Sequence, residues 1–322
     1  MDRRRLVGVA LILASAAGFG SGSLFAQPVY AAGVDWLVLS AWRFLFGATL
    51  TWGWLLLSAG RRRGLRALDR RSAVAAIALG VLYVGNSGSY YAGLETVSPS
   101  LAALIVYIYP ALVAVFSLRF GRRLEGRRAW LALVLALAGV ALSVGGIDPD
   151  GAPPVEGLLL VIASPIIYSV WIVLSARLAG ERKDAVGELA NDGAEAAPAA
   201  ALMITTTAGV YWIAALTGGQ AVLPGAVPSE AWFGLLGVGV LSTFVAIQTF
   251  YAGAQRIGAA QAALISTVEP IWTIALAAIL FGVGLTPVQL IGGGLILVAV
   301  VVAQTGPEAE RARRPAVRVA DA

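Results

Sequence analysis

One acidic side chain stands where a membrane protein could do chemistry with it. Glu269 lies directly before a proline in the stretch Gln261 to Pro270, QAALISTVEP, about ten residues into a long apolar segment. A charge at the centre of a transmembrane helix costs at least about 2.5 to 3.5 kcal/mol, so it needs a partner or a water-filled cavity. Three roles are open: a site for a substrate ammonium group or a proton, an ion-pair partner of Arg43, or a protonated acid bonded to nearby backbone.

Arg43 is the second charge inside an apolar segment, about seven residues from its start. At about 1.5 Å per residue it lies roughly 10 Å below one membrane face. A long side chain at that depth can reach the interface or bond loop carbonyls, which favours a structural or gating role. Pro110 and Pro270 are also candidates for a structural or gating role, because a proline inside a helix removes a backbone hydrogen-bond donor and kinks the helix. The freed carbonyl could line a path, or the kink could serve packing alone.

Polar and aromatic residues recur at steps of three and four along several apolar segments, which places them on one face of each helix. Because polar groups in lipid turn toward the protein interior, these faces should meet around a cavity, although such stripes also suit plain helix packing. The candidate cavity residues are Asn86, Tyr90, Tyr107, Ser164, Tyr168, Trp171, Gln248, Tyr251, Ser266, Glu269 and Trp272. Rings, an amide, hydroxyls and one acid suit a small zwitterion or organic cation. A phosphorylated substrate would need several arginines or lysines.

The composition identifies a membrane protein and removes most catalytic schemes. Of the 322 residues 59% are apolar and 13% charged, and the mean hydropathy is +0.82. There is no cysteine and no histidine, so disulfides, thiol nucleophiles, Cys or His metal sites and the commonest general base are excluded. We therefore expect no enzyme, no metal and no cofactor. The net charge of +5 suggests no nucleic-acid partner, because no soluble basic domain carries it.

Apolar runs near bilayer length predict ten transmembrane helices, with the lipid bilayer as their partner. They cover about 7–27, 37–58, 73–94, 99–119, 129–146, 155–178, 197–217, 231–254, 259–281 and 286–305. Apart from Arg43, 22 of the 23 basic residues lie at the termini or in loops that follow even-numbered segments. The loops after odd-numbered segments carry only acids, namely Asp35, Glu95, Asp148, Asp150, Glu156 and Glu230. The positive-inside rule then predicts that both termini are cytoplasmic.

A duplicated segment divides the chain into two halves. Leu101 to Pro110, LAALIVYIYP, matches Gln261 to Pro270 at an offset of 160, and the match extends back to the triplets that begin at Tyr91 and Tyr251. A weaker match at an offset of 149 sets Gly8 and Ala14-Ser15 beside Gly157 and Ala163-Ser164. Because each half holds five segments, an odd number, the second half must enter the membrane from the opposite side. Such inverted repeats are typical of transporters that work by alternating access, although two old copies could also serve only as a scaffold.

The boundaries follow from this duplication. We expect an all-α integral membrane protein of two inverted five-helix repeats, 1–146 and 155–305, with an extracytoplasmic linker at 147–154 and a cytoplasmic tail at 306–322. Gly, Pro and Asp mark the linker region. The mixed-charge connector 180–197 is expected to be a cytoplasmic loop.

These features resemble a known family. The ten segments, Trp42-Arg43-Phe44, the two prolines and Leu124-Glu125 are similar to the EamA branch of the drug/metabolite transporter superfamily, and most of all to its bacterial amino-acid exporters. One departure is that Gly284 and Leu285 stand where the second repeat should carry the Leu-Glu pair.

The resemblance implies a secondary transporter in the bacterial inner membrane that exports small metabolites, amino acids including aromatic ones. Other metabolites or organic cations remain an alternative substrate class, and coupling to protons stays open. A membrane-embedded lipid-modifying enzyme is the alternative from another class, disfavoured by the missing catalytic motifs.

Overall fold

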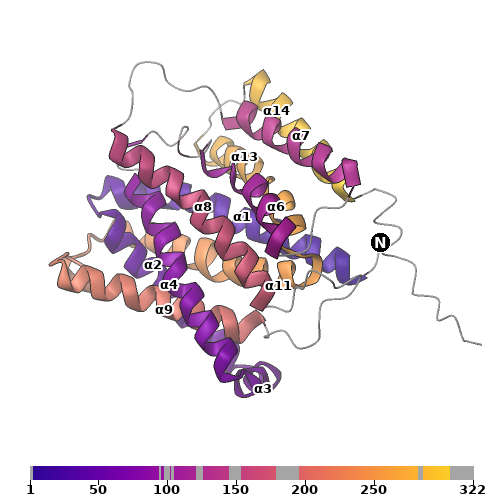
Figure 1. Ribbon diagram of the computed structural model, residues 1–322. Helices are drawn as coiled ribbons and strands as arrows, with labels where there is room; N and C mark the ends of the chain where they lie inside the picture. Colours follow the sequence, from indigo (N-terminus) through magenta and orange to yellow (C-terminus); the bar gives the residue numbers. More distant parts are fainter. Residues whose placement is uncertain are drawn as a thin grey trace, which may run out of the picture.

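The chain was analysed as a computed structural model, and it is helical throughout the part that the structure describes (Figure 1). That part comprises residues 3–93, 96–97, 102, 105–120, 126–144, 154–178, 196–281 and 286–304. The first half contains α1 (Arg3–Ala31), α2 (Trp36–Leu56), α3 (Ala59–Ala67), α4 (Arg70–Gly93), α6 (Tyr109–Phe120) and α7 (Gly126–Val144). The second half contains α8 (Val155–Leu178), α9 (Ala196–Thr217), η1 (Pro224–Ala226), α10 (Ala231–Gly237), η2 (Val238–Val245), α11 (Ala246–Ile257), α12 (Ala259–Ser266), α13 (Glu269–Phe281) and α14 (Pro287–Gln304).

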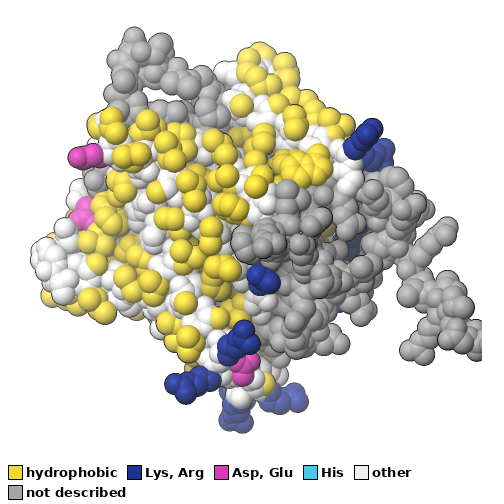
Figure 2. All heavy atoms as spheres, viewed as in Figure 1, with side chains coloured by type: hydrophobic (Ala, Val, Ile, Leu, Met, Phe, Trp, Pro, Cys, Tyr) yellow, Lys and Arg dark blue, Asp and Glu magenta, His cyan; other side chains and the backbone are white. Residues whose placement is uncertain are grey.

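The described helices include five segments that can cross a membrane by length and composition alone. They are Arg3–Ala31, Arg70–Gly93, Val155–Leu178, Ala197–Thr217 and Ala231–Ile257. Large apolar side chains are exposed on the outer faces of these helices, for example Val81 of α4 and Leu159 of α8, where they would face lipid. Figure 2 shows apolar side chains covering much of the visible face. The structure is therefore that of an all-helical membrane protein.

Three local features differ from the expected helices. The arginine-rich loop after α2 forms the short helix α3. The expected helix over 259–281 is interrupted between α12 and α13. The helix expected over 231–254 contains η2, a π-helix of eight residues in which backbone N–H groups bond carbonyls five positions back. Leu101, Leu124, Glu125, Gly284 and Leu285, the linker 147–153 and most of the connector 180–197 lie outside the described residues.

Glycines from the repeated segments make the same helix crossing twice. Gly8, near the start of α1, packs against α11, where a Cβ added to Gly253 would lie 3.1 Å from the Gly8 carbonyl oxygen. Gly157, near the start of α8, packs against α4, where a Cβ added to Gly93 would lie 3.2 Å from the Gly157 carbonyl oxygen. Only residues without a side chain allow backbones to approach so closely. The two crossings are related by the sequence offsets of 149 and 160 found above.

A pair of hydrogen bonds repeats this relation further along the same helices. The Ser15 hydroxyl donates to the Ala246 carbonyl oxygen at 2.8 Å, and the Ser164 hydroxyl donates to the side-chain oxygen of Asn86 at 2.9 Å. Ser164 follows Ser15 by 149 positions, and Ala246 follows Asn86 by 160. The position is therefore equivalent in the two halves, although the acceptor is a backbone carbonyl in one and an amide side chain in the other.

The crossings of α4 with α9 and of η2 with α2 form a third equivalent pair. A Cβ on Gly80 would lie 2.6 Å from the Met203 carbonyl oxygen, and a Cβ on Gly239 would lie 3.3 Å from the Arg43 carbonyl oxygen. Met203 follows Arg43 by 160 positions. Three pairs of equivalent contacts are consistent with two duplicated halves.

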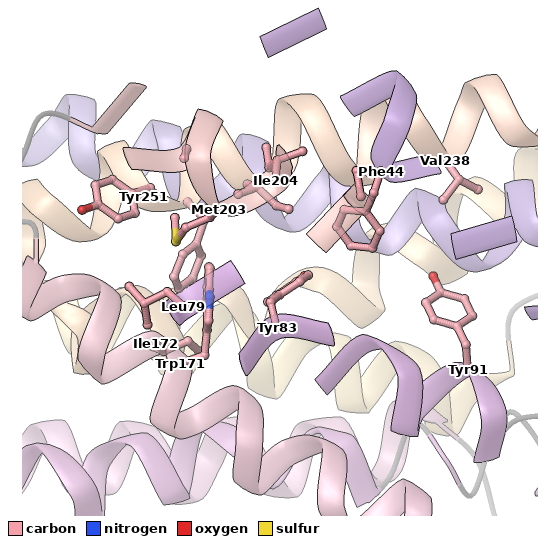
Figure 3. Packing of buried hydrophobic residues seen from close by; sticks show 14 of the residues in the cluster. Phe44, Leu79, Tyr83, Tyr91, Trp171, Ile172, Met203, Ile204, Val238 and Tyr251 are labelled. Carbon is pink, nitrogen blue, oxygen red and sulfur yellow. The ribbon is translucent and has the colours of Figure 1, made fainter. Parts of the chain in front are cut away.

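The remaining helices enclose an aromatic core. Figure 3 shows buried side chains that extend from Tyr251 and Met203 at one end, past Tyr83 and Trp171, to Tyr91 at the other. The helices α7 and α14 lie side by side at the edge of the molecule (Figure 1). This leaves the interior of the bundle to α1, α2, α4, α6, α8, α9 and the helices from α10 to α13, which carry the candidate site.

Candidate functional site

Two helices are interrupted just before a proline, at positions 160 residues apart. The N–H groups of Thr267 and Val268 bond carbonyls three positions back, at 3.3 and 3.2 Å, and α13 begins at Glu269. In the first half the N–H of Ile108 bonds the Ile105 carbonyl at 3.2 Å, and α6 begins at Tyr109. Glu269 and Tyr109 therefore occupy equivalent positions, each the first residue of the helix that follows the break.

Glu269 is partly buried beside α1. Its carboxylate accepts a hydrogen bond from the hydroxyl of Tyr107. Gly20 lies against it, since a Cβ at Gly20 would be 3.3 Å from the Glu269 Cγ and 2.9 Å from its carbonyl oxygen. The Thr273 hydroxyl donates to the Gly20 carbonyl oxygen at 2.9 Å and ties α1 to α13. A small residue on α1 thus allows that helix to approach the broken segment and its acid.

Five tyrosines surround the carboxylate. The side chains that interact electrostatically with Glu269 are Tyr83, Tyr90, Tyr107, Tyr109 and Tyr168. The rings of Tyr83, Tyr109 and Tyr168 form a connected group with Trp171: the centroids of Tyr109 and Tyr168 are 4.9 Å apart, and those of Tyr83 and Trp171 are also 4.9 Å apart. The structure therefore brings together five of the predicted residues, namely Tyr90, Tyr107, Tyr168, Trp171 and Glu269.

Arg43 lies deep in the bundle, 3% exposed. Its Nε donates to the Thr243 hydroxyl of η2 at 3.2 Å. The guanidinium carbon lies 4.7 Å from the ring centroid of Phe44 and 5.1 Å from that of Tyr91. Within the described residues Arg43 forms no ion pair, so the reading of Glu269 as its partner has no support in this conformation.

Two more predicted residues join α4 to α8. Asn86 accepts the hydrogen bond of Ser164 described above, and both side chains are buried. Ser266 lies beside the Tyr109 hydroxyl, while its own hydroxyl donates to the Ala262 carbonyl oxygen at 3.0 Å. These polar groups border the tyrosine cluster.

The other predicted residues, Gln248, Tyr251 and Trp272, make no hydrogen bond to the carboxylate among the described residues. The Gln248 amide donates to the Thr51 hydroxyl at 3.4 Å, and the buried hydroxyl of Tyr251 has no hydrogen-bond partner among the described residues. Both lie in α11, and Tyr251 lies at the end of the aromatic core opposite Tyr91 (Figure 3). Trp272 is 42% exposed and donates to the Ser21 hydroxyl at 2.9 Å. Its ring therefore faces outward, although its nitrogen is bonded within the bundle.

Sequence reasoning missed two residues of the cluster. Tyr83 shares the helical stripe of Asn86 and Tyr90, which is expected to line the cavity, but it is absent from the candidate residues, and so is Tyr109. Tyr109 had a usable signal, because it precedes Pro110 as Glu269 precedes Pro270. No group of three or more Asp, Glu, His or Cys residues able to hold a metal occurs in the part of the chain that the structure describes.

Known proteins place this geometry in a family. Residues 6–145 and 155–305 match the EamA-like transporter family. An uncharacterized transporter of Archaeoglobus fulgidus is 28% identical over 301 residues, which cover 92% of this chain and 96% of that protein. The uncharacterized inner membrane transporter YedA of Escherichia coli K12 is 28% identical over 276 residues, 84% of this chain and 82% of YedA. A crystal structure with 22% sequence identity superposes with a TM-score of 0.71 over 97% of this chain and 99% of that one, which shows the same fold. This chain is a multi-pass membrane protein, a transporter and not an enzyme, and it belongs to the EamA-like transporter family.

Proposed function

We propose that this protein is a secondary transporter that exports small metabolites, amino acids including aromatic ones, by alternating access. The two repeats are residues 1–146 and 155–305, with the linker 147–154 outside and the tail 306–322 in the cytoplasm. The substrate binds in a central cavity between the repeats, next to the broken helices, as in other carriers built from inverted repeats. The bacterial inner membrane is the proposed location, because the similar E. coli protein is an inner membrane transporter.

The observation that carries this proposal is the pair of equivalent glycine crossings. Gly8 and Gly253 meet near the start of α1 and the end of α11, whereas Gly157 and Gly93 meet near the start of α8 and the end of α4. If α1 and α8 enter the membrane from opposite sides, these crossings close opposite faces. If one crossing separates while the equivalent crossing stays closed, the protein opens to one side of the membrane at a time.

The distribution of charge supports the orientation. Basic side chains lie around α3 and the start of α4 and at the right of the visible face, and acidic side chains lie at its left edge, although acidic atoms also lie among the basic side chains near α3 (Figure 2). Arginine-rich loops stay on the cytoplasmic side of bacterial membranes. On this basis the proposed topology has both termini in the cytoplasm and the loop before Glu230 outside.

The substrate class follows from the cluster around Glu269. A carboxylate among tyrosine rings can bind an ammonium group by charge and by cation–π contact, and the rings offer stacking surfaces to an aromatic substrate. The same features fit an organic cation, which is the alternative substrate. The outward direction rests on the likeness to amino-acid exporters alone, and proton coupling through Glu269 remains a part of the hypothesis.

Counterflow in proteoliposomes tests this function. Proteoliposomes that contain the wild-type protein and are loaded with unlabelled substrate should accumulate labelled aromatic and aliphatic amino acids with saturable kinetics. The panel of labelled compounds should include an organic cation. Glu269→Gln should lower the rate at least about tenfold, because it removes the charge that meets the ammonium group. Glu230→Gln, which changes an exposed acid at the start of α10, is the matched control and should retain the wild-type rate.

Unchanged flux in Glu269→Gln would remove that residue from the site. Flux that grows linearly without saturation would indicate a channel instead of a carrier, and covalent turnover of a lipid would contradict the transporter mechanism.

A further inference from the structure

We propose that Arg43 is the anion-binding end of the substrate site, where its guanidinium group receives the carboxylate of a zwitterionic substrate. This rests on the proposed transport function and narrows its substrate class to molecules with both charges. It gives Arg43 a role in recognition in place of the structural role that its sequence position suggested.

The guanidinium of Arg43 has unused donors. Only its Nε has an acceptor among the described residues, the hydroxyl of Thr243 at 3.2 Å. The rings of Phe44 and Tyr91 lie over the group, and a ring face attracts the cation without accepting the N–H bonds that point outward in the guanidinium plane. The four N–H groups of the two terminal nitrogens are left for a ligand. A planar fork of this kind matches the two oxygens of a carboxylate.

Helix packing does not require the charge. The equivalent crossing in the other half is made by Met203, whose carbonyl oxygen faces Gly80 as the Arg43 carbonyl oxygen faces Gly239. Both crossings depend on a backbone contact with a glycine, and in one of them the residue that supplies the carbonyl oxygen, Met203, is apolar. A buried cation without a carboxylate is costly in a membrane, so a residue that packing does not need is best explained by a ligand.

Arg43 and Glu269 lie at similar depth. Arg43 is three residues from the middle of α2, Trp36–Leu56, which is about 4.5 Å along the axis, and Glu269 is close to the middle of the broken helix pair α12 and α13. Tyr83 interacts electrostatically with both the guanidinium and the carboxylate. The Phe44 ring beside the Arg43 guanidinium also contacts the Tyr83 ring, with centroids 5.9 Å apart, so the surroundings of the arginine adjoin the tyrosine cluster.

Two further hydroxyls border the arginine. Ser40 lies one helical turn before Arg43 on α2, and Ser87 lies on α4; both are close to the Tyr211 hydroxyl, which itself interacts with Arg43. Both serine hydroxyls are buried, and the Tyr211 oxygen is the nearby acceptor for them. A carboxylate at Arg43 would offer these hydroxyls further acceptors.

Competition on the wild-type protein tests the proposal without any variant. Reconstituted protein exchanging a labelled aromatic amino acid is challenged with the same amino acid, its amide, which lacks the carboxylate, and its decarboxylated amine. We expect the amide and the amine to compete at least about 30-fold more weakly than the amino acid, the size of effect expected when one partner of a buried charge pair is lost. Equal competition by all three would overturn the proposal.

Variants then assign the effect to Arg43. Arg43→Met copies the residue that makes the equivalent crossing and should retain folding. It should reduce amino-acid exchange at least about tenfold while amine exchange persists, and Arg43→Lys should recover part of the loss. Arg61→Gln is the matched control, because Arg61 also lies over a ring, Trp54 at 4.2 Å, but belongs to the basic helix α3.

The two proposals fail in different ways. If no amino acid, amine or organic cation is exchanged, the proposed function fails. If exchange occurs but Arg43→Met lowers amino-acid and amine rates by the same factor, Arg43 only supports the fold and this inference is wrong.

Discussion

Replacing Gly20 by alanine tests whether close approach of α1 to the break at Glu269 matters for transport. A Cβ at this position would lie 2.7 Å from the Thr273 Oγ1 and 2.9 Å from the Glu269 carbonyl oxygen, whereas ordinary contacts begin at 3.4 Å. The backbone at the start of α13 must therefore retreat by at least about 0.5 Å. Overpacking of this kind costs about 1 to 3 kcal/mol. Alanine regains about 1 kcal/mol of helix propensity, so the net destabilisation is about 0 to 2 kcal/mol.

The effect on transport should exceed the effect on stability. Moving the first residue of α13 shifts the carboxylate away from Tyr107 and the other tyrosines, and a misplacement of this size can lower a rate about 100-fold. Thermal unfolding in detergent and counterflow in proteoliposomes measure the two quantities. Gly53→Ala is the control, because a Cβ there meets nothing within 4 Å, and it should be stable and active. The reasoning is refuted if Gly20→Ala matches Gly53→Ala in both assays.

Three further predictions concern the cavity, the topology and the edge helices. Tyr168→Ala removes three ring contacts and should lower counterflow of aromatic amino acids about two- to tenfold relative to aliphatic ones; a loss of expression alone would indicate a packing role. A cysteine that replaces Glu230 should react with an impermeant thiol reagent from outside intact cells, and one that replaces Arg62 should not; the reverse pattern would invert the topology. Gly139→Ala places a Cβ 2.7 Å from the Gly292 carbonyl oxygen and should lower the unfolding temperature. Gly294→Ala is the control, because its Cβ meets nothing within 4 Å, and it should leave the unfolding temperature unchanged. Equal unfolding temperatures for the two variants would show that α7 and α14 can move apart without loss of stability.

Helices and duplication could be read from the sequence because both leave local signals. Apolar runs of bilayer length gave the helices, and the shared prolines and YAG triplets gave the offset that the structure repeats in its contacts. The acid at Glu269 stood out for the same reason, since a charge in an apolar run is visible without any knowledge of neighbours.

Contacts between distant segments could not be predicted. Nothing in the sequence near Arg43 indicates that Thr243 and Tyr91 approach it, because those residues lie in other helices. The π-helix η2 was also hidden, since its residues Val238–Val245 are almost all apolar and an apolar run has no period to reveal a change of hydrogen bonding. The prediction that Gln248 and Trp272 share one cavity with Glu269 remains untested, because a stripe gives the face of one helix and not its partner.

The π-helix also marks a difference in length between the two halves. From Gly80 to Gly93 in α4 there are 13 positions, whereas from Gly239 to Gly253, the glycines with the equivalent contacts, there are 14. The second half therefore holds one additional residue, and the wider turns of η2 take it up, so that the flanking helices keep their register with α1 and α2. The gene segment for this helix is therefore one codon longer than its duplicate, and the stretch that takes up the extra residue includes Thr243, whose hydroxyl accepts the hydrogen bond of Arg43.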